Sequence, residues 1–141
     1  MHYFEYKNGE LYCEEVPIKK ILEDVGTPVY IYSAKTIRRH YKVFEKSFSN
    51  IDHLICYSVK ANSNIAIISL LKQLGSGADI VSAGELKRAL KAGIDPKKIV
   101  FSGVGKTPEE IEFALLADIL MFNVESLEEL ETLGEIAKKL E

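Results

Sequence analysis

The sequence predicts an α/β fold in which parallel strands alternate with helices, preceded by two short antiparallel strands. From Thr27 onward, short apolar runs alternate with amphipathic stretches at a period of about 21 residues, which is typical of parallel strand–helix units. Three of these stretches begin with a hydroxyl residue followed three positions later by Glu, a common helix start. Near the N-terminus, two β-like runs flank Asn8-Gly9, a dipeptide that favours a tight hairpin.

The elements follow in order from these patterns. We expect strands at residues 3–6 and 11–13, and a helix that begins at Pro17 and ends near Gly26. The expected strand–helix pairs are residues 29–32 with 34–48, 53–57 with 64–74, 78–81 with 83–92, 99–101 with 108–116, and 119–122 with 127–140.

Such units build either an open doubly wound sheet or a closed barrel, and the local pattern does not separate the two. A closed barrel needs about eight units. Either the sheet is open, therefore, or the chain is incomplete. In a partial barrel we expect Ile55, Tyr57, Ile80 and Val100 to face the interior and to lack the opposite wall.

Composition excludes several classes of protein. The chain is 47% hydrophobic and 28% charged, as is usual for a folded domain, and its net charge of −3 offers no basic surface for nucleic acid or for a membrane. The first residues lack the pattern of a signal peptide, and no apolar run is long enough to span a bilayer. The two cysteines and three histidines have no metal-site spacing. We expect a cytoplasmic protein without a metal.

Lys60 is the first candidate for chemistry. In parallel β/α proteins the loops after the strands carry function, and Lys60 follows the apolar run 54–57. A lysine amine there would be partly desolvated, which favours the neutral form that attacks an aldehyde to give a Schiff base. The alternative is a lysine that only extends its amine from a strand end into solvent. Spacing alone does not favour the functional interpretation.

A family resemblance, carried by three motifs in the family's order, favours the functional interpretation of Lys60. Tyr57-Ser58-Val59-Lys60-Ala61-Asn62 resembles the cofactor-lysine motif of the alanine-racemase-like, fold-type III pyridoxal-phosphate enzymes. Residues 77–86 resemble the next signature of that family, at the family's separation. Residues 26–33 are similar to the segment that leads into the barrel of diaminopimelate decarboxylases, and the likeness covers essentially the whole chain.

The resemblance implies a fold and a domain division. It implies that residues 28–141 are the first part of a (β/α)8 TIM-type barrel that binds pyridoxal 5'-phosphate and is incomplete in this chain. Residues 1–27, with their short strands and helix, would contribute to a second, β domain.

The resemblance also assigns site residues. Lys60 is implied to hold the cofactor covalently and to take part in catalysis. Asp79, 19 positions later at the end of the next strand, would orient the lysine, although it would otherwise pass for an ordinary loop carboxylate. Ser58 and Ser102 are implied to line the cofactor, and Asn123 the pocket floor.

Two further features have competing interpretations. Glu85 lies near the site in the family pattern, but it could equally complete a capping box with Ser82. Gly103-Val104-Gly105-Lys106-Thr107 suggests a phosphate loop, but such a loop requires Gly at the position of Val100, so Thr107 is better explained as a helix cap.

The implied activity is decarboxylation of meso-2,6-diaminopimelate to L-lysine and CO₂, the last step of lysine biosynthesis, by a homodimer acting on a small amino acid. Three alternatives stay open. One is a sister decarboxylase for ornithine, arginine or carboxynorspermidine; another is a cofactor-carrying protein without turnover; the third is a structural fragment that binds nothing. The family's phosphate loop and the acidic partner of the cofactor ring are expected later in the chain, so we expect residues 1–141 alone to be inactive.

Overall fold

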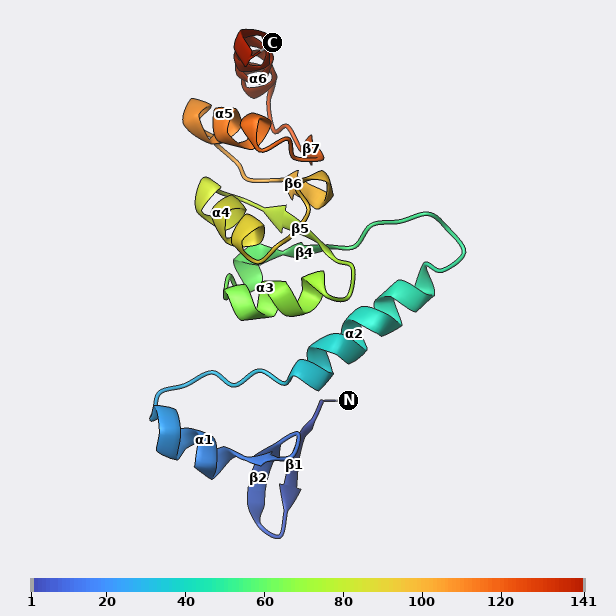
Figure 1. The fold of residues 1–141 in the computed structure, drawn as a ribbon, viewed down its shortest axis with the longest axis vertical. Helices are drawn as coiled ribbons and strands as arrows, with labels where there is room; N and C mark the ends of the chain where they lie inside the picture. The colour runs from blue at the N-terminus through green and yellow to red at the C-terminus, as the bar shows by residue number, and fades with distance from the viewer. Residues whose placement is uncertain (1, 141) are drawn as a thin grey trace. The chain divides into compact units, whose positions relative to one another are not determined.

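The computed structural model of the chain describes residues 2–140, which divide after Asn50 into two compact units (Figure 1). None of the described helices is both long enough and apolar enough to cross a membrane.

The first unit begins with a three-stranded antiparallel sheet in the order β1 (Phe4–Lys7), β2 (Glu10–Cys13) and β3 (Val16–Pro17). The β1–β2 turn has positive φ at both Asn8 (52°) and Gly9 (84°), as a two-residue hairpin of this hand requires. The predicted hairpin is therefore confirmed. The third strand was not predicted, because two residues are too few to show a period. Helix α1 (Ile18–Val25) begins one residue after Pro17, which ends β3.

Glu14 connects this sheet to helix α2 (Ala34–Ser47). Its Oε1 accepts hydrogen bonds from the Ser33 hydroxyl and from the Lys35 N–H, both at 2.8 Å. The bond from the Lys35 N–H is the main cause that holds the pKa of the Glu14 carboxyl below its ordinary value. Glu14 adopts a φ of 56°, which is unfavourable for a residue with a side chain. The carboxylate thus caps α2 from a strained turn.

Residues 29–32 do not form the strand that the sequence predicted. They lie between α1 and α2, and no strand within residues 2–140 pairs with them. Val29, Tyr30 and Tyr32 are exposed, Tyr30 to 90%. Their β-branched and aromatic side chains favour an extended backbone, but a strand also needs a hydrogen-bonded neighbour.

The second unit is a parallel sheet in the order β4-β5-β6-β7, with each strand followed by a helix. The strands are β4 (Cys56–Ser58), β5 (Gly77–Ile80), β6 (Ile99–Phe101) and β7 (Met121–Phe122), and the helices are α3 (Ile65–Lys72), α4 (Ala83–Lys91), α5 (Pro108–Leu116) and α6 (Leu127–Leu140). Figure 1 shows α3, α4 and α5 on one side of this sheet. Strands in sequential order with helices on one side are the arrangement of a barrel segment, whereas a doubly wound sheet reverses its strand order.

The core lies between the sheet and its helices. Ile80, Ile99 and Phe101 are fully buried there, together with Leu86 of α4 and Ala114 of α5. Burying a side chain the size of Ile or Leu stabilises the fold by about 1.5–3 kcal/mol.

The opposite face of the sheet carries the polar residues. Because side chains alternate along a strand, Ser58, Asp79 and Val100 project away from the helices. The expectation that Tyr57 and Ile80 face the barrel interior is wrong, since both belong to the helix-side core. Strands of parallel sheets are often apolar on both faces, so the hydrophobic pattern does not show which side chains face the helices and which face the barrel interior.

Candidate functional site

Lys60 lies on a single 3-10 turn, η1 (Val59–Ala61), that follows the end of β4. Val59 is fully buried and anchors the turn, while the Tyr57 hydroxyl donates to the Asn62 carbonyl at 3.1 Å. The Asn62 N–H in turn donates to the Val59 carbonyl at 3.1 Å. The residues around Lys60 therefore fix the backbone from which its side chain extends.

Lys60 itself is exposed. The expectation that the strand end desolvates its amine is wrong for residues 2–140, because the 3-10 turn carries the side chain out of the apolar strand. Any burial of this amine would have to come from a bound group or from other residues.

Ser58 and Asp79 form a polar pair across β4 and β5, where the sheet register places them side by side. The Ser58 hydroxyl donates to Asp79 Oδ2 at 2.8 Å. Asp79 Oδ1 is buried and has no hydrogen-bond partner among the described residues. Such an atom is costly, which indicates a place for a donor from a bound group. Burial, and secondarily the charge of Asp79, raise the pKa of the adjacent Cys56 thiol.

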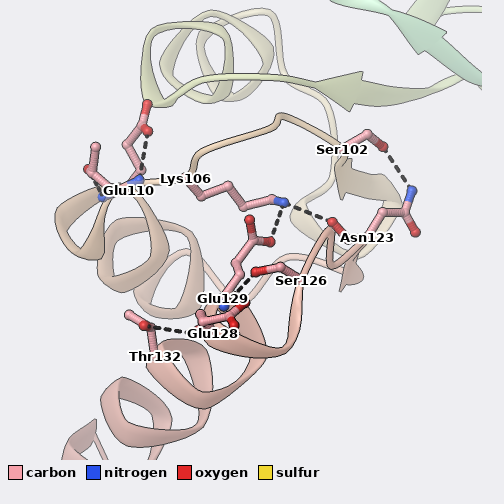
Figure 2. Close-up of polar contacts among 9 residues, drawn as sticks. Ser102, Lys106, Glu110, Asn123, Ser126, Glu128, Glu129 and Thr132 are labelled. Atoms are coloured by element: carbon pink, nitrogen blue, oxygen red, sulfur yellow. Dashed lines mark hydrogen bonds and ion pairs between the residues drawn. The ribbon is translucent and has the colours of Figure 1, made fainter.

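Ser102 and Asn123 form a second polar pair, immediately after β6 and β7. The Asn123 amide donates from Nδ2 to the Ser102 hydroxyl at 2.8 Å (Figure 2). The first pair lies within the last two residues of β4 and β5, and the second directly follows β6 and β7, so both stand at the carboxyl ends of neighbouring parallel strands. The structure thus brings Ser58 to Asp79 and Ser102 to Asn123, at the edge of the sheet that also carries Lys60.

Glu85 is used by the main chain of its own loop. Its N–H donates to the Ser82 hydroxyl at 3.2 Å, and its carboxylate accepts from the Val81 N–H at 2.8 Å. The carboxylate therefore reaches one residue beyond the helix cap, so the capping box with Ser82 is only half formed. A complete capping box is present at Thr107 and Glu110 of α5.

The β6–α5 loop passes very close to the β5–α4 loop. A Cβ at Gly103 would lie 2.4 Å from the Val81 carbonyl oxygen, a distance that no side chain tolerates. The Glu110 carboxylate also accepts from the Ala83 N–H at 2.9 Å, which links α5 to the start of α4. The loops at this edge are therefore held to one another.

Lys106 is a buried residue for which the sequence predicted no role at the site. Its side chain is fully buried in an ion pair with Glu129, with 2.6 Å between Nζ and Oε1. Nζ also donates to the Asn123 carbonyl at 2.8 Å (Figure 2). The partner carboxylate lies a whole strand–helix unit further along the chain, so no local spacing could have revealed the pair.

These residues fit pyridoxal phosphate. The cofactor requires an amine for covalent attachment and polar groups that orient it. The carboxyl ends of these strands present the Lys60 amine, the Asp79 oxygen that has no partner within residues 2–140, and the hydroxyl and amide of the second pair.

Comparison with known proteins agrees with this arrangement. Residues 34–141 match the family described as "Pyridoxal-dependent decarboxylase, pyridoxal binding domain". The chain is 52% identical to the diaminopimelate decarboxylase of Vibrio cholerae over 99% of this chain and 34% of that protein. It is also 52% identical to that of Aquifex aeolicus, over 98% of this chain and 32% of that protein. The chain thus spans about a third of the length of these relatives.

Two crystal structures show the same fold. The diaminopimelate decarboxylase of M. jannaschii, in complex with L-lysine, matches with a TM-score of 0.93 and 38% identity over 97% of this chain and 33% of that one. The Helicobacter pylori enzyme, also complexed with L-lysine, matches with a TM-score of 0.84 and 50% identity over 87% of this chain and 31% of that one. The fold class and the resemblance seen in the sequence are confirmed. The chain belongs to the pyridoxal-dependent decarboxylases, as a member of their pyridoxal-binding domain, and the cofactor of this family is pyridoxal phosphate.

Proposed function

We propose that this chain is the cofactor-binding part of an enzyme that decarboxylates meso-2,6-diaminopimelate to L-lysine and CO₂, the last step of lysine biosynthesis. The observation that carries the proposal is the Lys60 turn beside the Ser58–Asp79 pair, in a chain about half identical to proteins named diaminopimelate decarboxylase. Two relatives were crystallised with L-lysine, the product of this reaction, which supports the proposal.

Each of the residues at the carboxyl ends of the parallel strands has a role in the proposed reaction. Lys60 holds the cofactor through Nζ and carries a proton on the same atom during turnover. Asp79 Oδ1 accepts a hydrogen bond that orients the site, while Ser58 fixes Oδ2. Ser102 and Asn123 line the pocket, and Glu85 contributes through the Val81 main chain. When bound, pyridoxal phosphate supplies an electron sink for the carbon that loses CO₂.

The site assignment is tested by mapping a covalent adduct. The full-length protein is loaded with pyridoxal phosphate, reduced with borohydride and digested, and we expect the added mass on Lys60. An adduct on Lys72, Lys87 or Lys106 instead would overturn the assignment.

Lys60→Ala is expected to lower turnover by at least about 10²–10⁴-fold, because it removes both the attachment point and a proton carrier. Lys72→Ala, exposed on α3, is the matched control.

The other candidate functions give different outcomes in the same preparation. The lysine/ornithine decarboxylase of Vibrio vulnificus is only 23% identical (TM-score 0.75), and a Chlorella virus arginine decarboxylase 20% (TM-score 0.74), so they share the fold alone. Release of CO₂ from ornithine, arginine or carboxynorspermidine, but not from diaminopimelate, would favour a sister decarboxylase. An adduct on Lys60 without any CO₂ release would indicate a cofactor-carrying protein, and no adduct at all an inert fragment.

We further propose a cytoplasmic homodimer in which residues 28–141 are the first part of a barrel and residues 1–27 contribute to a β domain. The sequential parallel sheet supports the barrel, and the small antiparallel sheet supports the β domain. A light-scattering mass of the full-length protein equal to one chain would contradict the homodimer.

A further inference from the structure

Lys106 is a charged residue in an environment where lysine is seldom found. Its side chain has no solvent exposure, and the Phe101 ring centroid lies 5.5 Å from Nζ. A buried ammonium is tolerated only when its charge is paired and its N–H groups are hydrogen-bonded. Glu129 Oε1 at 2.6 Å pairs the charge, and together with the Asn123 carbonyl at 2.8 Å it accepts from two of the three N–H groups, as Figure 2 shows.

Lys106 helps to hold the main chain of Asn123 in place. The Asn123 N–H donates to the Phe101 carbonyl at 2.9 Å, and its own carbonyl accepts from Lys106. Both main-chain polar groups of Asn123 are thereby held, which fixes the direction in which its side chain leaves the backbone. That side chain donates to Ser102 at 2.8 Å.

Stability alone does not account for this arrangement. A buried ion pair contributes little that well-packed apolar side chains of similar volume would not also provide. An apolar side chain at position 106 could not, however, form a directional bond to the Asn123 carbonyl. Lys106 joins three segments in this way: the loop after β6, the loop after β7, and the first turn of α6.

We propose that Lys106 is a positioning residue that, paired with Glu129, holds the Ser102–Asn123 pair in the orientation that contacts pyridoxal phosphate. The proposal rests on the proposed function, because it requires the cofactor to bind at this edge of the sheet. Lys106 acts through Asn123 and does not itself touch the reacting atoms.

The test replaces the whole ion pair, so that no charge is left buried alone. Lys106→Met/Glu129→Met in the full-length protein keeps the volume and the packing, and its folding is checked by the midpoint of urea unfolding. We expect the Kd for pyridoxal phosphate to rise by about tenfold or more, equivalent to the loss of one well-placed hydrogen bond. The circular-dichroism band of the bound cofactor should also change, because this band reports orientation. The matched control, Lys97→Met/Asp118→Asn, removes an exposed ion pair, keeps a residue that tolerates the positive φ of 57° at position 118, and should change neither measurement.

The outcomes separate the proposal from a structural role. A folded Lys106→Met/Glu129→Met variant with the wild-type Kd and band would overturn it, since only packing would then matter. If that variant does not fold, the test uses Asn123→Ala, which changes an exposed residue. An unchanged Kd and band in this variant would show that the Asn123 side chain does not orient the cofactor, and the proposed role of Lys106 would be overturned. If the wild-type protein bound no pyridoxal phosphate, the proposed function would be wrong and this proposal would fall with it. Binding by the wild type together with an unaffected variant overturns the role of Lys106 alone.

Discussion

At the scale of single residues, Cys56 offers a way to measure the charge on Asp79. Burial raises the pKa of the Cys56 thiol first, and the Asp79 charge raises it further. Asp79→Asn keeps an oxygen that accepts from Ser58 but removes the charge, so the Cys56 pKa should fall and its thiolate fraction should increase. We expect faster alkylation of Cys56 by iodoacetamide at pH 8, followed by peptide mass mapping.

The internal control is Cys13, whose pKa is raised by burial and by Glu14 and should not respond to the change at position 79. Equal alkylation rates for Cys56 in the two proteins would contradict the contribution of Asp79 to the raised pKa of this thiol.

The sequence located some of these residues and missed others for a physical reason. Lys60, Ser58 and Asp79 stand in short motifs at strand ends, where the chain itself places them together. The Lys106–Glu129 pair spans 23 positions and depends on how α6 packs against the preceding loop. The exposure of Lys60 was also not predictable, because a 3-10 turn of three residues leaves no period to detect.

At the scale of elements, the start of α2 should be sensitive to acid. The hydrogen bond from the Lys35 N–H is the main cause that lowers the pKa of Glu14. The carboxylate therefore contributes its full stabilisation at pH values above its ordinary pKa of 4.5. This stabilisation is lost as the pH falls through the lowered value in the native protein. Wild type should therefore melt at a higher temperature than Glu14→Gln at pH 6, and the difference should shrink below pH 4.5.

Glu23→Gln, at an exposed position on α1, provides the comparison for a general effect of charge. A difference in melting temperature between wild type and Glu14→Gln that stays constant from pH 6 to pH 3 would contradict the cap.

Elements with their own start signals were predicted well, and those defined by pairing were not. Helices α5 and α6 have the predicted bounds, because Thr107 and Ser126 accept the N–H groups of Glu110 and Glu129. Residues 29–32 have strand-like side chains without a strand partner among residues 2–140, and β3 is defined solely by its pairing with β2. Pairing is a property of two segments, which a local pattern cannot supply.

At the scale of the whole molecule, we expect residues 1–141 expressed alone to be poorly soluble or molten. Strands β4 and β7 are the edges of the described parallel sheet, and unpaired edges promote aggregation. The second unit also exposes large apolar side chains, among them Leu54, Met121, Leu127 and Leu130. Gel filtration with urea unfolding is the measurement. A compact monomer with one sharp transition would show that the segment is self-sufficient and would contradict the partial barrel.

The carboxylates that link neighbouring units have a consequence for synthesis on the ribosome. Glu110 bonds to a main-chain group 27 residues earlier, and Glu129 to a lysine 23 residues earlier, so the loops after β5 and β6 are each completed by the helix of the following unit. A nascent chain leaves the ribosome with its N-terminus first. The loop of the unit made last therefore lacks its partner carboxylate until the next helix has been made. In a chain released after Leu116, the Lys106 amine should react readily with an acylating reagent, whereas in the finished protein it should be protected. Equal labelling of the two would show that the preceding loop closes without its successor.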